Sequence, residues 1–212
     1  GLVVQPGVEF GPMTVYHLPL ERPFDLRSVM MRWPNLALEA HSTDYQKPAA
    51  YPRLAELGFA YQKVGPALTF AWRQAIYALD QMLSFLHGSA PIVIPTMERI
   101  MLENAGAWQS HYQGEPNAKF AQRHLALADR IRYYWPHPDA QAAVSALMTA
   151  MESQTLNRSV SELFFPNSTL ERAELCGGLN AETLITSSVE QSLEPYFFHS
   201  GSFAAPTRER SA

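Results

Sequence analysis

The sequence predicts an α/β fold in which about three strand–helix units are followed by a helical extension. Strand and helix signals alternate through the first ninety residues, a spacing typical of parallel strands joined by crossover helices. After Pro91 the pattern changes to helices alone. Three parallel strands are too few for a stable sheet with both faces covered. We therefore expect these units to be part of a larger α/β fold or barrel.

The expected division of the chain follows these signals. Residues 1–90 hold the strand–helix units, residues 91–199 form the helical extension, and the small, polar residues 200–212 form a disordered tail. The chain opens on an apolar, strand-like run without an initiator Met, so we also expect it to be a fragment that begins inside a folded unit.

Short apolar runs ended by turn residues predict the strands. The expected strands cover residues 2–4, 36–40 and 59–64. Apolar residues at helical spacing predict the helices of this part. These cover residues 23–33, 51–57 and 68–86. Gly58 and Gly88 stand where the last two of these helices end, and each suits the left-handed conformation that ends a helix.

The extension is expected to hold four helices. They cover residues 96–102, 117–134, 139–152 and 181–193. Thr96 and Asn180 are the expected N-terminal caps of the first and last, because their side-chain oxygens can accept a backbone N–H. Residues 158–178 mix apolar and turn residues and predict no single element.

Composition excludes several classes of protein. Of the 212 residues, 47% are hydrophobic and 17% charged, which fits a globular core and disfavours a disordered chain. The net charge of −4, with no basic stripe, disfavours nucleic-acid binding. No run reaches the roughly 20 apolar residues of a membrane helix, and the first residues do not form a signal peptide. The single cysteine, Cys176, fits a reducing compartment, so we expect a cytoplasmic protein.

Polar residues at the end of the second predicted strand form the first candidate site. Glu39 and His41 are two residues apart on the strand and should share one face. In α/β barrels the active site lies at the carboxyl ends of the strands. His41 could ligate a metal, with Glu39 or Asp44 as a further ligand or orienting group. Alternatively, His41 makes a loop hydrogen bond and Glu39 pairs with a Lys or Arg from another strand.

The second candidate is a glycine turn between the third strand and the helix that follows it. Backbone N–H groups at the start of a helix favour an anion, so Gly65 and Thr69 are candidates for binding a phosphate. The alternative is an ordinary strand-to-helix turn with Pro66 in the first turn of the helix.

The third candidate is a segment rich in arginine and aromatic residues. Such residues are the usual anchors of protein interfaces, and Arg130, Arg132, Tyr133 and Trp135 are the candidates for one here. Alternatively, the segment packs against its own domain. In that case, Asp129 would pair with Arg132, three residues further on.

Four ordered motifs make the sequence resemble a known family. They are VVQPGVEF, EAHSTDYQ, KVGPALTFA and DRIRYYWP, which begin at residues 3, 39, 63 and 129. The chain resembles the C-terminal half of the non-catalytic subunit of D-tagatose-1,6-bisphosphate aldolase. The resemblance implies that the three strands are the last three of a TIM-type barrel.

A comparison with class II aldolases tests whether the zinc site is kept. Those enzymes carry a zinc-binding His-Gly segment on the strand that matches the first one here, where this chain has Pro6-Gly7 and then Glu9. Their second zinc His matches His41, and their phosphate turn has an Asn in place of Gly65. Glu9 could substitute only as an oxygen ligand. One ligand position is thus kept and one lost, whereas a catalytic zinc needs three.

The resemblance implies an accessory role in sugar-phosphate breakdown. The family is the partner that a zinc-dependent catalytic subunit needs for activity and stability, in galactitol and N-acetylgalactosamine catabolism. Zinc is therefore expected in the partner subunit, and no residue of this chain is expected to be catalytic. The runner-up interpretation is a stand-alone, metal-dependent sugar-phosphate aldolase that uses His41 and Glu39. The family has also carried a tagatose-6-phosphate kinase label, but the chain has no GxxxxGK[ST] loop.

Overall fold

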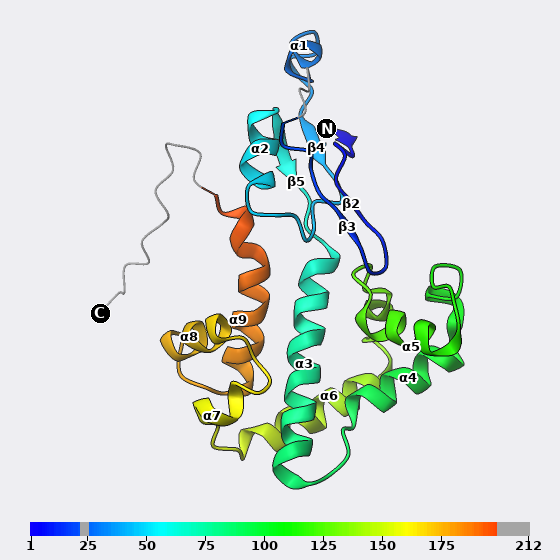
Figure 1. The fold of residues 1–212 in the computed structure, drawn as a ribbon, viewed down its shortest axis with the longest axis vertical. Coiled ribbons are helices and arrows are strands. Elements are labelled where there is room, and N and C mark those ends of the chain that lie inside the picture. Colours follow the sequence, from blue (N-terminus) through cyan, green and yellow to red (C-terminus); the bar gives the residue numbers. More distant parts are fainter. Residues whose placement is uncertain (22–25, 199–212) are drawn as a thin grey trace. The chain divides into compact units, whose positions relative to one another are not determined.

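The computed structural model describes residues 1–21 and 26–198 (Figure 1). The chain divides into two compact units. Of the described residues, the strand unit holds 1–9, 15–21, 26–64 and 193–198, and the helical unit holds 10–14 and 65–192. The expected tail and the start of the expected helix 23–33 lie outside the described residues.

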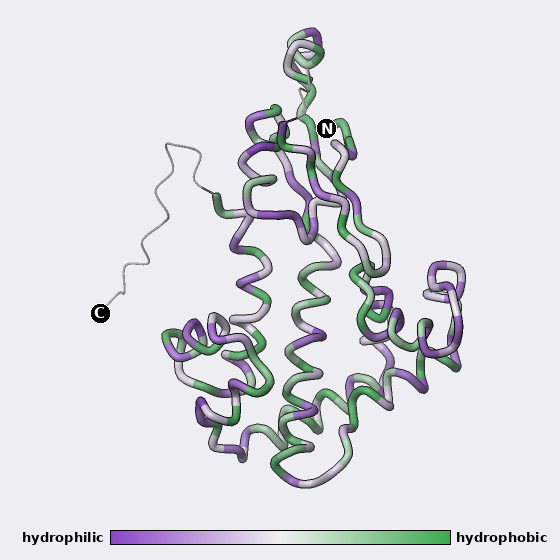
Figure 2. The backbone as a smooth tube through the Cα atoms, viewed as in Figure 1, coloured by the Kyte–Doolittle hydropathy of each residue, from purple (hydrophilic) through white to green (hydrophobic). Residues whose placement is uncertain are grey.

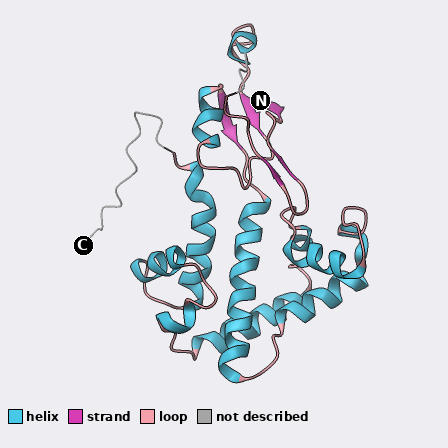
Figure 3. Cartoon of the chain, viewed as in Figure 1, coloured by secondary structure: helices cyan, strands magenta, loops and turns pink. Residues whose placement is uncertain are grey.

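A parallel three-stranded sheet lies at the centre of the strand unit. Its strands β1 (Leu2–Val4), β4 (Leu38–Ala40) and β5 (Phe59–Gln62) lie in that order, with β4 in the middle. All three strands and their parallel pairing were predicted. Figure 3 shows the sheet with its helices, α1 (Leu26–Met30) and α2 (Ala50–Glu56). Gly58 follows α2 with a φ of 96°, as its place in the sequence predicted.

The core of the strand unit forms between the sheet and its connections. Leu38 and Ala40 of β4 pack with Phe59 of β5 and Leu54 of α2, all at most 3% exposed. The alternation along β4 turns these two residues inward, and it places Glu39 on the opposite face. The central strand therefore presents one apolar face to the core and one polar side chain away from it.

A short hairpin was missed by the sequence analysis. Strands β2 (Glu9–Phe10) and β3 (Val15–Tyr16) pair in a second, two-stranded sheet. The buried Gln46 holds its end, because its Oε1 accepts from the Leu18 N–H at 3.0 Å and its Nε2 donates to the Tyr16 carbonyl at 3.1 Å. Two-residue strands have no periodicity, so nothing in the local pattern could indicate them.

Helix α3 (Pro66–His87) is the longest element of the helical unit and matches the predicted helix. Its hydropathy alternates along its length (Figure 2), and it ends at Gly88 with a φ of 64°. The other elements of the helical unit are α4 (Val93–Glu103), η1 (Ala105–Ala107), α5 (Pro116–Leu125), η2 (Arg130–Tyr133), α6 (Pro138–Glu152), α7 (Arg158–Ser161), α8 (Asn167–Leu175) and α9 (Ala181–Leu193). A last turn, η3 (Glu194–Tyr196), belongs to the strand unit.

Two of the predicted helices of the extension are confirmed with their ends. Helix α6 covers the expected 139–152, and α9 covers the expected 181–193. The predicted cap of α9 is also present, because Asn180 Oδ1 accepts from the Thr183 N–H at 3.0 Å. These signals succeeded because the residues that carry them lie within one turn of the helix they start.

Two expectations about the extension were wrong. The single helix expected over 117–134 ends at Leu125, and the chain then turns through Asp129 with a φ of 46° into the 3₁₀ turn η2. Helix α4 begins before Thr96, whose hydroxyl donates to the Ile92 carbonyl. The N-terminus of α4 is instead capped from α3, because Asp80 accepts the N–H groups of Ile92 and Val93 at 3.0 and 2.8 Å.

Helix α3 groups differently in the structure from its place in the sequence-based division of the chain. By its contacts, α3 groups with the helical elements, although the sequence places it in the third strand–helix unit. The expected boundary near residue 90 concerns a larger fold and stays a prediction. Among the described residues, no helix is long and apolar enough to cross a membrane.

Candidate functional site at the sheet edge

Glu39 and His41 meet at the carboxyl end of β4. His41 Nε2 lies 2.7 Å from Glu39 Oε1, and about a third of each side chain is exposed. The two-residue spacing predicted that they share a face, and the geometry follows from it. Glu39 contacts His41 as an orienting group would, and metal binding by either residue stays a prediction. A partly exposed imidazole–carboxylate pair can hold a proton and pass it to a bound group.

Gln5 joins the ends of β1 and β4. Its Nε2 donates to Glu9 Oε2 at 2.7 Å and to Ser42 Oγ at 2.9 Å. Gln5 was not among the candidates predicted from the sequence, although the rule that singled out His41 applies equally to the residue after β1. Ser42 has a φ of 58°, and Tyr45 has one of 63°. Such left-handed backbone costs energy in residues other than glycine and often marks a functional loop.

Thr43 is fully buried and lies at the centre of a second cluster of polar side chains around the same loop. Its Oγ1 donates to the Lys63 carbonyl at 2.7 Å and lies 3.1 Å from the Tyr196 hydroxyl. Tyr51 donates to the Thr43 carbonyl at 3.2 Å, and the Tyr51 and Tyr196 rings lie 4.5 Å apart. Burial raises the pKa of both tyrosines, so each stays a protonated donor. These contacts fix the loop that carries Ser42.

Asp44 and Glu9, the remaining candidate ligands, differ in exposure. Asp44 is 2% exposed, whereas Glu9 lies at the surface, where Gln5 holds it. Among the described residues, no three His, Cys, Asp or Glu side chains are grouped closely enough to hold a metal ion. The described side chains at this edge therefore do not by themselves make up a three-ligand zinc site.

The glycine turn at the start of α3 has the contacts of an ordinary strand-to-helix turn. The Leu68 N–H donates to the Gly65 carbonyl at 3.1 Å, and Thr69 Oγ1 donates to the Pro66 carbonyl at 3.2 Å. Pro66 is the first helical residue. A phosphate would compete with these internal bonds, and phosphate binding by Gly65 and Thr69 stays a prediction.

The segment rich in arginine and aromatic residues is tied to its own unit. Arg130 donates to the Ala107 carbonyl, and Arg132 donates to Tyr133 Oη at 2.8 Å. Trp135 packs edge-on against Trp72 of α3, with ring centroids 4.7 Å apart. Tyr133 is 53% exposed. The interface assigned to Arg130, Arg132, Tyr133 and Trp135 stays a prediction, with Tyr133 as its most accessible member.

The ion pair expected within this segment is wrong. Asp129 does not pair with Arg132, whose guanidinium donates to the Asp129 backbone carbonyl at 3.1 Å. The Asp129 carboxylate instead accepts from Arg73 Nε at 2.7 Å, and both side chains are at most 1% exposed. A buried carboxylate needs a charged partner, and the guanidinium of α3 supplies it.

A further cluster of buried and partly buried ionisable side chains was not predicted from the sequence. His124 lies between Tyr77, 2.7 Å from its Nδ1, and Glu98, 3.0 Å from its Nε2. Arg123 donates to the same carboxylate at 2.7 Å. Burial lowers the pKa of His124, although Glu98 opposes the shift. Burial alone would raise the pKa of Glu98, but the bonds from Arg123 and His124 lower it.

Comparisons with known proteins point to one family over almost the whole chain. The family model described as D-tagatose-1,6-bisphosphate aldolase subunit GatZ/KbaZ-like matches residues 1–200. A D-tagatose 6-phosphate 4-epimerase of Agrobacterium fabrum is 40% identical over 202 residues, which cover 94% of this chain and 47% of that protein. The aldolase subunit GatZ of Klebsiella pneumoniae is 38% identical over 199 residues, or 92% of this chain and 46% of that protein.

A solved structure shows the same fold. It is described as a probable tagatose 6 phosphate kinase from Sinorhizobium meliloti 1021, and it matches with a TM-score of 0.85 at 38% identity. The match covers 92% of this chain and 51% of that one. The chain thus spans about half the length of the relatives that it matches.

Proposed function

Because the chain belongs to the GatZ/KbaZ-like family of D-tagatose-1,6-bisphosphate aldolase subunits, we propose that it is part of an accessory subunit. In this role it supports the activity and stability of a zinc-dependent catalytic subunit. The observation that carries the proposal is the match over residues 1–200, together with relatives named as aldolase subunits. The pathway is the breakdown of galactitol and N-acetylgalactosamine, and the compartment is the cytoplasm.

The proposed architecture is the C-terminal part of a TIM-type barrel. The parallel order β1, β4, β5, with a helix after β4 and another after β5, supports it. The solved relative is about twice as long as the matched region, which leaves room for further strands. In this architecture the polar groups after β1 and β4 lie at the end of the barrel where sugar phosphates bind.

The bonds at the sheet edge support an accessory role. His41 is bonded to Glu39, and Gln5 bridges Glu9 and Ser42. These side chains bond to one another instead of converging on one point, as the ligands of a catalytic zinc do. We therefore assign the zinc to the partner subunit. A sugar phosphate that reaches this edge would find hydroxyl and amide groups that can orient it.

The surface proposed to meet the catalytic subunit centres on Tyr133. The guanidinium of Arg132 lies 4.5 Å from the centre of the Tyr133 ring, and that of Arg130 lies 5.3 Å from it. These two cations hold an exposed ring in place before binding, which lowers the entropic cost of an interface contact. Trp135 anchors the segment to its own unit, because its ring packs against the ring of Trp72.

Co-purification with a catalytic class II aldolase subunit tests the proposal. The full-length protein should form a complex and raise the aldol-cleavage activity and heat resistance of that subunit. Tyr133→Ala should weaken the complex, whereas Tyr61→Ala, at a tyrosine of similar exposure in the strand unit, should leave it unchanged. No complex and no gain in activity would contradict the accessory role. Equal effects of the two variants would contradict the assigned surface alone.

A stand-alone enzyme is the second candidate, favoured by the epimerase relative and the Glu39–His41 pair. In a 2-ketose phosphate, removal of the C4 hydroxyl proton breaks the C3–C4 bond and leaves the electron pair in an enediolate. Return of that carbon to the other face of the aldehyde inverts C4. Aldol cleavage and C4 epimerisation thus share one bond-breaking step, and His41 would take the proton.

The test of this candidate uses the protein without any partner. If it is right, the full-length wild type, assayed with and without added divalent metal, should cleave or epimerise D-tagatose 6-phosphate or its 1,6-bisphosphate. His41→Ala should abolish that activity, and His17→Ala, at an exposed histidine of the same unit, should not. A wild type that is inactive alone but activates a catalytic subunit would refute the second candidate and support the first.

A further inference from the structure

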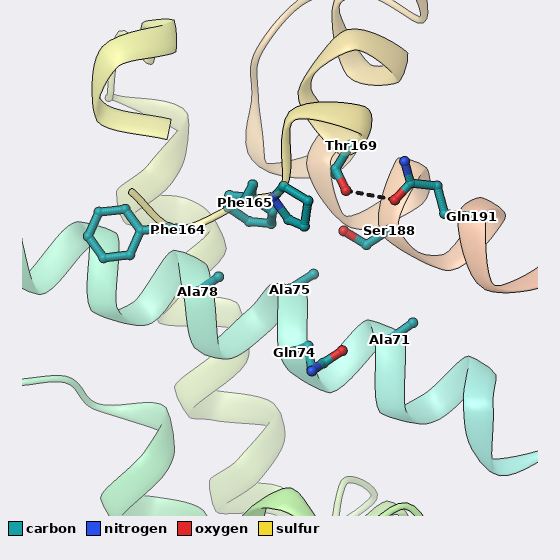
Figure 4. A pocket seen from close by; sticks show the side chains of 10 residues that line it. Ala71, Gln74, Ala75, Ala78, Phe164, Phe165, Thr169, Ser188 and Gln191 are labelled. Atoms are coloured by element: carbon teal, nitrogen blue, oxygen red, sulfur yellow. Dashed lines mark hydrogen bonds between the residues drawn. The ribbon is translucent and has the colours of Figure 1, made fainter. Parts of the chain in front are cut away.

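A cavity of about 320 Å³ lies within the helical unit, between α3 and the segment that runs from Phe164 to α9 (Figure 4). Its floor consists of Ala71, Ala75 and Ala78 of α3, which Figure 4 shows along the side of the helix that faces Phe165 and Ser188. The volume lies at the lower end of the roughly 300–1,000 Å³ typical of small-molecule sites. Neither the sheet-edge site nor the Tyr133 surface includes any of these residues.

Polar side chains of three helices, α3, α8 and α9, line this cavity. Gln74 of α3 and Gln191 of α9 each bring a carboxamide, and Thr169 and Ser188 each bring a hydroxyl. Thr169 Oγ1 donates to Gln191 Oε1 at 2.8 Å, which fixes the orientation of the Gln191 carboxamide (Figure 4). Ser188 Oγ donates to the Leu184 carbonyl at 2.8 Å and keeps its lone pairs for a ligand.

Much of this hydrogen-bonding capacity is unused by the protein. Within the described part of the chain, the carboxamide of Gln74 has no hydrogen-bond partner, and neither has the Nε2 of Gln191. A carboxamide offers two donors and one acceptor. Two such groups with two hydroxyls match a ligand that carries several neighbouring hydroxyls, each both a donor and an acceptor.

The lining also sets the charge of the ligand. Every residue that lines the cavity is uncharged. A phosphate or carboxylate in it would lose hydration without gaining a cation, which is strongly unfavourable. The alanine floor and the nearby Phe164 and Phe165 rings offer an apolar surface to the C–H groups of a ligand. An uncharged ligand with a hydroxyl-rich edge and an apolar face fits both features.

We propose that the cavity between α3 and α9 binds an uncharged sugar or sugar alcohol. The site is separate from the sheet edge and does not rest on the proposed function. Its selectivity is opposite to that of a sugar-phosphate site, since it accepts the neutral compound and rejects the phosphorylated one. A subunit with such a site can respond to the unphosphorylated carbohydrate.

Calorimetric titration and ligand-observed NMR on the whole chain test the proposal. The probes are D-tagatose and galactitol, with D-tagatose 6-phosphate as the charged counterpart. Gln74→Ala should weaken binding of the neutral probes roughly fivefold to tenfold, the effect of losing about one hydrogen bond. Gln81→Ala, two turns further along α3 and outside the cavity, is the matched control and should change binding less than about twofold.

A second variant tests the cavity itself. Ala75 lies on the floor and is 2% exposed, so Ala75→Leu fills the space and should abolish binding of the neutral probes. If this variant does not fold, the result for Gln74→Ala is sufficient to test the proposal. The Gln74 side chain is exposed, so its removal should not disturb the core.

Three results would overturn the proposal. The first is that neither neutral probe binds the wild type at millimolar concentration. The second is that Gln74→Ala and Gln81→Ala weaken binding equally. The third is that D-tagatose 6-phosphate binds as tightly as D-tagatose and with the same dependence on Gln74. Binding of the phosphate that is insensitive to Gln74 belongs to another site and leaves the expected result for the neutral probes unchanged.

Discussion

The buried ion pair between Arg73 and Asp129 makes the most demanding prediction. Asp129→Asn keeps the side-chain shape and tolerates the left-handed backbone at this position, where φ is 46°. It removes only the charge that neutralises Arg73. Since both side chains are at most 1% exposed, the guanidinium is left buried without a counter-charge. Loss of one partner of such a pair typically costs about 3–5 kcal/mol.

We therefore expect Asp129→Asn to lower the free energy of unfolding by about 4 kcal/mol, with a fall in Tm of roughly 8–16 °C. Urea and thermal unfolding followed by circular dichroism measure the two quantities. Arg132→Ala is the matched control, because that guanidinium reaches the backbone carbonyl of Asp129 and not its carboxylate. The control should cost less than about 1 kcal/mol.

A double variant separates the charge from the packing. Arg73→Met with Asp129→Asn removes both charges, so it should be more stable than Asp129→Asn alone. If Asp129→Asn costs less than about 1 kcal/mol, or no more than Arg132→Ala, the burial argument is refuted. If the double variant is the least stable of the set, the cost lies in the lost packing of Arg73 on the Phe70 ring, 4.4 Å away.

Three further predictions concern other contacts. Asp80→Ala removes the carboxylate that caps α4, so urea unfolding should show that the free energy of unfolding falls by about 2–3 kcal/mol. Asp80→Asn, which keeps one acceptor oxygen, should restore about half of that loss. Burial lowers the pKa of His124 below its ordinary 6.5. As the pH falls, the unfolded chain therefore takes up the proton before the folded chain does. The free energy of unfolding should be unaffected by His124 above pH 6.5 and should fall as the pH drops below it. His124→Gln should flatten that slope in unfolding curves between pH 7 and 5. Tyr196→Phe removes the hydroxyl beside Thr43 and should lower the free energy of unfolding by about 1 kcal/mol. Hydrogen exchange should then show weaker protection of the backbone amides near Thr43.

Much of the fold could be read from local patterns. The periodicity of α3 predicted both of its ends to within two residues, and Gly58 and Gly88 marked helix ends where left-handed residues stand. Asn180 capped its helix as expected. Each of these features depends on residues within a few positions of one another, so the chain carries the information locally.

The candidate site could be predicted only in part. The Glu39–His41 pair followed from a two-residue spacing on one strand. Gln5 could have been singled out as the residue after β1, but its bond to Ser42, 37 residues away, could not be predicted from a local pattern. The helix expected over 117–134 was wrong because the chain leaves the helix after Leu125 and then turns through Asp129, whose partner Arg73 is 56 residues distant. A helical pattern cannot show that a distant charge will hold one residue in a left-handed turn.

The sequence by itself determined the α/β class, most of the strands and helices, and the family. These follow from side-chain periodicity, turn residues and ordered motifs, which act over short stretches of chain. Only the tertiary structure decided which charges are buried together, how Gln5 links two strand ends, and that α3 and α9 enclose a cavity with unused carboxamides. These features join residues that are far apart in sequence, and burial makes their pairing obligatory because unpaired polar groups are costly away from water.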